Sequence, residues 1–133
     1  MMNWNGWPLE RGLILFVSLA YLLIGIQVTA FHYRQNFHHK SMYVPVILTP
    51  IVFVAGLILT VSNSDIMHDI FVVLLWIGIF AGIIGFILHV RGVGVRVGGY
   101  KMLRNFLVGP PMILPLLLTA MGVLGLMALY WRD

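Results

Sequence analysis

Four long apolar segments follow one another along the chain, separated by short polar stretches. They cover residues 12–31, 43–61, 70–90 and 106–131. None of the segments contains Lys, Arg, Asp or Glu. About 20 helical residues cross the hydrocarbon layer of a bilayer, and backbone amides inside that layer must be paired within the segment. The apolar positions are continuous rather than alternating, which excludes a barrel. We therefore expect an all-α, four-helix transmembrane bundle that forms a single domain over residues 1–133.

The composition agrees with a membrane protein. Hydrophobic residues make up 61% of the chain and charged residues 9%, whereas a soluble domain carries roughly 25% charged residues. The chain has no cysteine, which excludes disulfides, thiol chemistry and cysteine-ligated metals. The apolar part of residues 12–31 is too long for a cleaved secretory signal, so we expect a retained helix.

Charge is distributed unevenly between the connecting loops. Six basic residues lie in the loops after the first and third segments, namely Arg34, Lys40, Arg91, Arg96, Lys101 and Arg104. All four acidic residues lie toward the other ends of the segments, namely Glu10, Asp65, Asp69 and Asp133. The positive-inside rule then places the two basic loops in the cytoplasm and both chain termini outside. This is the pattern of a multi-pass cell-membrane protein of the bacterial inner-membrane type, and the basic residues give no reason to expect a nucleic-acid partner.

Two histidines stand out because they are expected at the same depth. His32 and His89 lie near the cytoplasmic ends of the first and third helices, which run in the same direction. His32 follows Gly25 by seven positions, and His89 follows Gly85 by four, so each histidine shares a helix face with a small residue. The spacing predicts that both imidazoles face the interior of the bundle.

Such a pair has two interpretations. The imidazoles could ligate a b-type haem, with Arg91, Arg96 and Arg34 holding the haem propionates. Alternatively, they only make hydrogen bonds between helices, as polar groups in membrane bundles commonly do. We favour the structural interpretation and predict no cofactor, with haem b as the alternative.

Glycine-rich stretches also allow alternatives. The motif Gly78-x-x-x-Gly82 permits close helix approach, either inside the bundle or between copies of the chain. The basic stretch 91–101 contains four glycines, which could form a nest for an anionic group or acidic lipid. We favour a flexible connector there, because its charges are already explained by topology.

The sequence contains few motifs that indicate catalysis, transport or metal binding. The apolar segments lack the charged side chains that ion-coupled pumps use, and no catalytic triad or metal-binding motif is present. We therefore expect a non-catalytic accessory or structural subunit of a larger membrane complex. It would contact lipid and either a partner membrane protein or further copies of itself. Two alternatives remain open: an electron-transfer anchor that uses haem or quinone through His32 and His89, and a small oligomeric channel or transporter.

Overall fold

The structure is a computed structural model that describes residues 3–131. Its helices are α1 (Leu9–Arg34), α2 (Tyr43–Val61), α3 (Asp65–Gly92), α4 (Leu103–Val108) and α5 (Ile113–Tyr130). A 3₁₀ turn, Lys40–Met42, precedes α2, and a π-helical turn, Val93–Val97, follows α3. Four of the helices, α1, α2, α3 and α5, are long and apolar enough to cross a membrane. The structure thus confirms the prediction of an all-α, small integral membrane protein with four candidate membrane-spanning helices.

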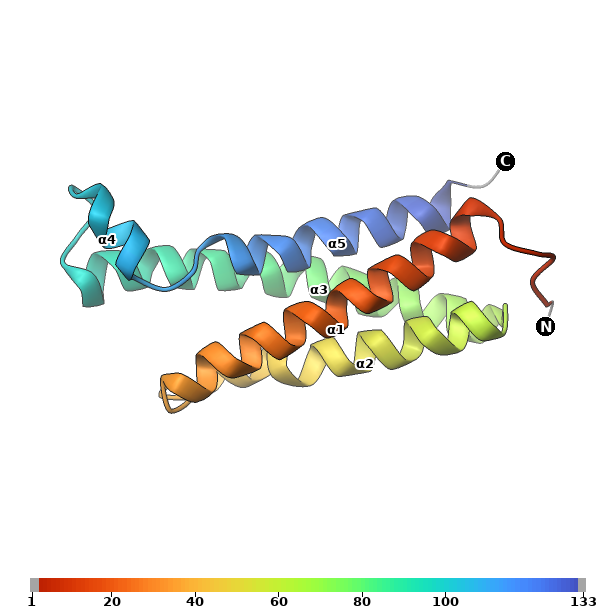
Figure 1. Cartoon of the computed structure of the whole chain (residues 1–133), viewed down its shortest axis with the longest axis horizontal. Coiled ribbons are helices and arrows are strands. Elements are labelled where there is room, and N and C mark those ends of the chain that lie inside the picture. Colours follow the sequence, from red (N-terminus) through yellow and green to blue (C-terminus); the bar gives the residue numbers. More distant parts are fainter. Residues whose placement is uncertain (1–2, 132–133) are drawn as a thin grey trace.

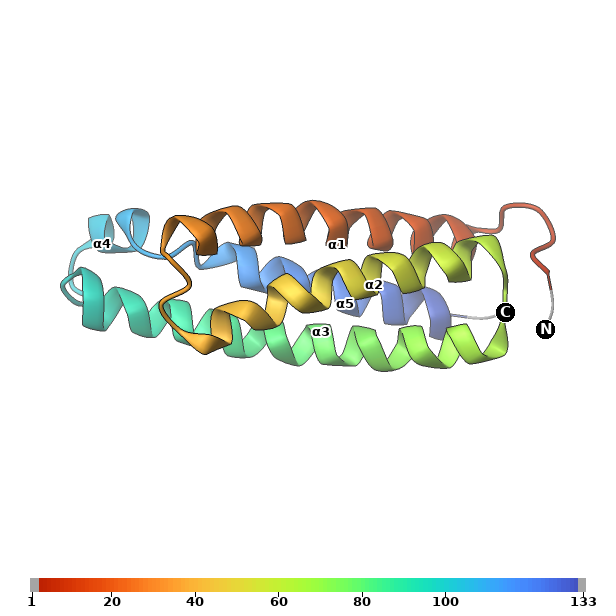
Figure 2. The ribbon, with the colours of Figure 1, turned by 90° about the horizontal axis from the view of Figure 1, so that it is seen from below.

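The four long helices lie side by side and alternate in direction (Figure 1). Both termini lie at one end of the bundle, which we call the terminal end, together with the α2–α3 connection. The α1–α2 connection and α4 lie at the opposite end, which we call the basic end because it carries the two basic loops. The second view (Figure 2) shows α1 and α3 on opposite sides, with α2 and α5 between them. Helix α5 contacts both α1 and α3, and so does α2.

Glycines set the distance between neighbouring helices. A Cβ added at Gly25 of α1 would overlap the hydroxyl of Thr49 in α2. A Cβ added at Gly82 of α3 would lie 2.5 Å from the carbonyl oxygen of Pro115 and 2.8 Å from the amide nitrogen of Thr119. The sequence left open whether these small residues face other helices of the same chain or a second copy. In the structure, Gly25 and Gly82 face other helices of the same chain.

The last long helix begins later than the sequence pattern predicts. Hydropathy suggested one helix over residues 106–131, but α4 ends at Val108 and α5 begins only at Ile113. Pro110 and Pro111 lie between them, and consecutive prolines disfavour helical backbone in the residue before each ring. Pro115 then falls within the first turn of α5, where a proline ring is tolerated.

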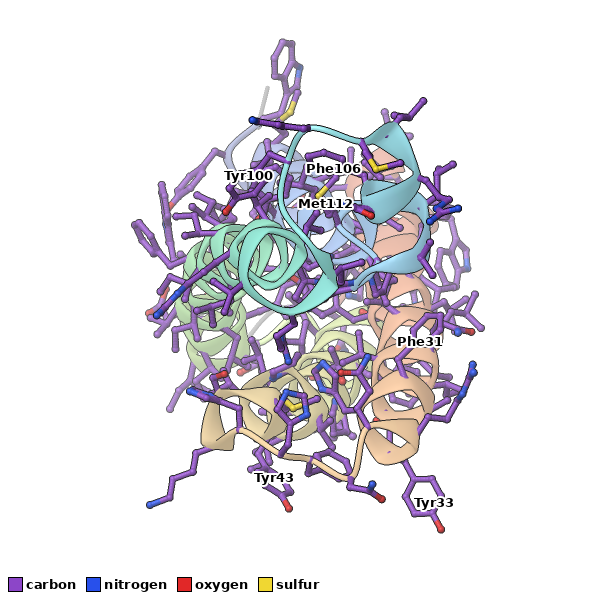
Figure 3. All side chains as sticks on the ribbon, turned by 90° about the vertical axis from the view of Figure 1, so that its left-hand side faces the viewer. Phe31, Tyr33, Tyr43, Tyr100, Phe106 and Met112 are labelled. Atoms are coloured by element: carbon purple, nitrogen blue, oxygen red, sulfur yellow. The ribbon has the colours of Figure 1, made fainter. Side chains whose placement is uncertain are left out.

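The basic stretch after α3, expected as a flexible connector, contains a helical turn and a chain reversal. Its first half continues α3 as the π-helical turn Val93–Val97. Gly98 and Gly99 then adopt φ values of +118° and +100°, which only glycine reaches without strain, and they reverse the chain. The rings of Tyr100 and Phe106 follow, with centroids 6.2 Å apart, on the α4 side of the basic end (Figure 3). The reversal leaves the end of α3 beside the start of α5.

Candidate functional site

A cavity of about 470 Å³ opens at the basic end of the bundle. We call it the histidine cavity. Its walls come from the ends of α1 and α3, the start of α2, the π-helical turn and the start of α5. Its polar wall residues are His32, Gln35, His38, His39, Ser41, His89, Arg91 and Arg96. None of the described residues that line it is acidic. Its volume lies within the range of about 300–1,000 Å³ that is usual for small-molecule sites.

The end-on view shows how this end of the bundle is built (Figure 3). Tyr33 and Tyr43 point outward from α1 and α2, away from the helix bundle. Tyr100, Phe106 and Met112 gather on the opposite side, next to α4. Tyr33, Tyr43 and Tyr100 each combine an apolar ring with a polar tip, a combination that favours a membrane interface.

His32 and His89 meet in the cavity from different helices. The ring of His32, on α1, is 9% exposed, and the ring of His89, on α3, is half-buried. Their centroids are 6.5 Å apart, and the ring planes are inclined by 66°. The pair therefore lies at one level of the bundle, in the wall of the histidine cavity.

Each of the two rings is oriented by a backbone carbonyl. Nδ1 of His32 lies 2.7 Å from the carbonyl oxygen of Met42, and Nδ1 of His89 lies 2.8 Å from that of Pro111. Because a carbonyl oxygen only accepts, we assign the ring hydrogen of each neutral histidine to Nδ1. Within residues 3–131, Nε2 of neither ring has a hydrogen-bond partner. Each Nε2 therefore keeps a lone pair that can bind a metal or accept a proton.

The sequence explains why the Pro111 carbonyl is available. In an α-helix this oxygen would accept from the N–H four positions later, at residue 115. That residue is Pro115, which has no N–H. The ring of His89 takes the position that the missing donor leaves, and this fixes the start of α5 against the end of α3.

Arg96 closes the site from the π-helical turn. Its Nη1 atom is in direct contact with Nε2 of His38, which belongs to the other basic loop. Nδ1 of His38 lies 3.1 Å from the carbonyl oxygen of Gln35, so Nε2 is the acceptor in the contact with Arg96. Arg91, one turn earlier on α3, also lines the cavity. Two guanidinium groups and no acidic side chain make this wall attractive to an anion.

Four residues singled out from the sequence, His32, His89, Arg91 and Arg96, line this one cavity. Arg34, also considered for the propionates, is not among its lining residues. Sequence reasoning missed the carbonyls that orient the rings and the contact between Arg96 and His38. Pro115 was a usable signal for the free Pro111 carbonyl, because it lies four positions later and has no N–H.

At the opposite, terminal end of the bundle, Nδ1 of His68 lies 3.7 Å from Oδ1 of Asp69.

The chain matches no protein-family model, no curated protein and no solved structure. The chemistry of the histidine cavity is therefore the main guide to function. Its walls are mostly apolar, and they include two cationic side chains and two imidazole rings with free lone pairs. Such a site suits a ligand with an apolar body, an acidic group and an atom that binds nitrogen.

Proposed function

We propose that this chain is an accessory subunit of a larger membrane assembly and that it holds an amphipathic ligand in the histidine cavity. The observation that carries the proposal is the cavity itself, where four imidazoles and two guanidinium groups share an otherwise largely apolar wall. An apolar ligand body would contact residues such as Val28 and Leu88, while an acidic group would pair with Arg96.

The proposal includes an orientation. The basic end carries the loops with the six basic residues of the connections, so the positive-inside rule places it in the cytoplasm. The terminal end would then face outward from a bacterial inner membrane. The ligand would lie near the cytoplasmic surface of the membrane and would be reached from that side.

An exposed polar side chain on α1 supports the proposal that the chain binds a partner subunit. Gln27 of α1 is exposed, and within the described residues its carboxamide has no hydrogen-bond partner. It lies inside the apolar part of α1, two turns before the helix ends at Arg34. An unpaired amide in an apolar environment costs roughly 1–3 kcal/mol. A helix of a partner subunit that bonds to Gln27 would remove this cost.

A channel through a single copy of the chain has less support. Tyr21, Phe71 and Leu75 are fully buried and fill the interior between the histidine cavity and the terminal end. Side chains packed this closely leave no continuous path along the bundle. Conduction would therefore have to pass between copies of the chain.

The deciding experiment is purification of the tagged chain from native membranes in mild detergent, followed by mass spectrometry of the intact assembly. We expect stoichiometric partner subunits and a bound small molecule that accompanies this chain. A matched pair of variants tests the interface: Gln27→Leu should release the partner, whereas Thr29→Val should not. Thr29 is also exposed on α1, but its hydroxyl already donates to the carbonyl of Gly25, 2.6 Å away. Recovery of the chain alone and without a ligand would contradict the proposal.

A further inference from the structure

Two unused imidazole lone pairs in one cavity restrict what the ligand can be. Nδ1 of His32 and of His89 is committed to a backbone carbonyl, so Nε2 is the free atom of each ring. A lone pair on nitrogen repels carboxylate and phosphate oxygens and attracts a metal ion. Donation of the ring hydrogen on the other nitrogen to a carbonyl is also the usual way in which proteins orient a histidine that binds metal.

The protein supplies too few ligands for a metal held by side chains alone. Within residues 3–131, no three side chains of His, Cys, Asp or Glu form a group that could hold a metal ion. Zinc sites use three or four protein ligands. A metal that needs only two imidazoles must bring its other ligands with it, as haem iron does with the four nitrogens of its macrocycle.

The separation of the rings agrees with two axial ligands. Nitrogen–metal bonds of about 2 Å on opposite sides of one metal ion put the imidazole centroids roughly 6 Å apart. The observed distance between the centroids of His32 and His89 is 6.5 Å. The two rings come from α1 and α3, so a flat ligand between them would lie between helices rather than along one.

The rest of the cavity wall suits the remaining parts of haem. Haem carries two carboxylates, and Arg91 and Arg96 are cationic groups in the same wall. Gly85 lies one turn before His89, and there is little room at this position for a larger residue. A Cβ there would lie 3.2 Å from Cβ of Pro115. Gly85 therefore lets the start of α5 approach α3 one turn before His89.

Together these observations assign a ligand to the cavity. We infer that the ligand is a b-type haem, with Nε2 of His32 and Nε2 of His89 as its axial ligands and with Arg91 and Arg96 beside its carboxylates. This inference rests on the proposed ligand cavity and names its occupant. A bound haem supplies one-electron redox chemistry. A quinone would leave both Nε2 lone pairs unused, because its carbonyl oxygens only accept hydrogen bonds.

The test begins with the absorption spectrum of the chain purified from native membranes, before and after reduction with dithionite. Haem extracted from the same sample is quantified against protein. We expect close to one haem per chain and a loss of at least tenfold in His32→Ala and in His89→Ala. His68→Ala serves as the matched control, because this histidine lies at the start of α3, at the terminal end. It should retain the haem of the unchanged protein.

A second variant separates ligation from folding. His89→Met replaces one nitrogen ligand by a sulfur ligand, and methionine–histidine ligation raises the reduction potential of haem iron. We expect this variant to retain haem with a higher midpoint potential. A histidine that only supports the fold would give no such shift.

Three outcomes would overturn the haem inference. The first is purified protein without haem but with another bound molecule, which would leave the proposed function standing. The second is an empty cavity in the intact assembly, which would contradict both proposals. The third is haem that is retained equally in all histidine variants, since it would then be bound elsewhere.

Discussion

The indole of Trp4 donates a hydrogen bond to the carbonyl oxygen of Leu59, 2.7 Å away, across 55 positions of the sequence. Leu59 lies in the last turn of α2, where carbonyl groups have no helical donor. Arg11 donates a hydrogen bond to the next carbonyl, with its Nε 2.9 Å from the oxygen of Thr60. Trp4, from the segment before α1, and Arg11, from the first turn of α1, thus cap the end of α2 at the terminal end of the bundle.

This contact predicts a stability difference between two tryptophans. Trp4→Phe keeps an aromatic ring but removes the donor, and we expect it to lower the free energy of unfolding by about 1 kcal/mol. Trp7→Phe is the matched control, because Trp7 is 62% exposed and stacks on Arg11 without a hydrogen bond within the described residues. Titration with dodecyl sulfate in mixed micelles would measure both. Equal effects of the two substitutions would contradict the capping role.

A second prediction concerns the α3–α5 interface. In Gly82→Ala the new methyl group would meet the Pro115 carbonyl and the Thr119 amide, which are backbone atoms and cannot move alone. Overpacking of this kind costs about 1–3 kcal/mol, measured as a lower free energy of unfolding. Gly12→Ala is the control, because no atom lies within 4 Å of the added Cβ. A Gly82 variant as stable as the control would show that α3 and α5 can separate slightly without cost.

A third prediction concerns the orientation of His89. Pro115→Ala restores an N–H that can bond to the Pro111 carbonyl and compete with the imidazole. Removing the support of a metal-bound histidine typically weakens metal affinity by 10–100-fold. We therefore expect hemin titration of the apoprotein to show a loss of about that size. The control is Pro50→Ala, in the exposed middle of α2. If both variants bind hemin as the unchanged protein does, the carbonyl of Pro111 is not what positions the ring.

Hydropathy alone located the helices but not all of their limits. The expected span 43–61 coincides with α2 (Tyr43–Val61), because polar residues flank that apolar segment on both sides. Helix α3 begins at Asp65, five residues before its apolar segment, since polar residues start helices well and hydropathy disregards them. Residues 106–112 are apolar yet contain the Gly109–Pro111 break, so a hydropathy window could not separate them from α5.

Regular helix geometry was enough to predict part of the candidate site, namely the depth and the helix face of its two histidines. Depth and face follow from counting residues along a regular helix, and this brought His32 and His89 to one level. The partners of their rings do not follow from such a count. The carbonyls of Met42 and Pro111 occupy their positions because of how the chain leaves one helix and enters the next. The contact between Arg96 and His38 depends on the π-helical turn, for which the sequence shows no periodic signal.

The last prediction tests the proposed orientation in the membrane. The chain has no cysteine, so a single introduced thiol is the only one that can react. Asn63→Cys places it in the α2–α3 connection at the terminal end, and Lys101→Cys places it in the connection after α3 at the basic end. A maleimide that does not cross membranes should label the first variant in intact spheroplasts and the second only after permeabilisation. The reverse pattern would mean that the basic loops face outward, against the charge rule, and that the histidine cavity is reached from outside the cell. Labelling of both variants in intact spheroplasts would mean that the chain inserts in two orientations.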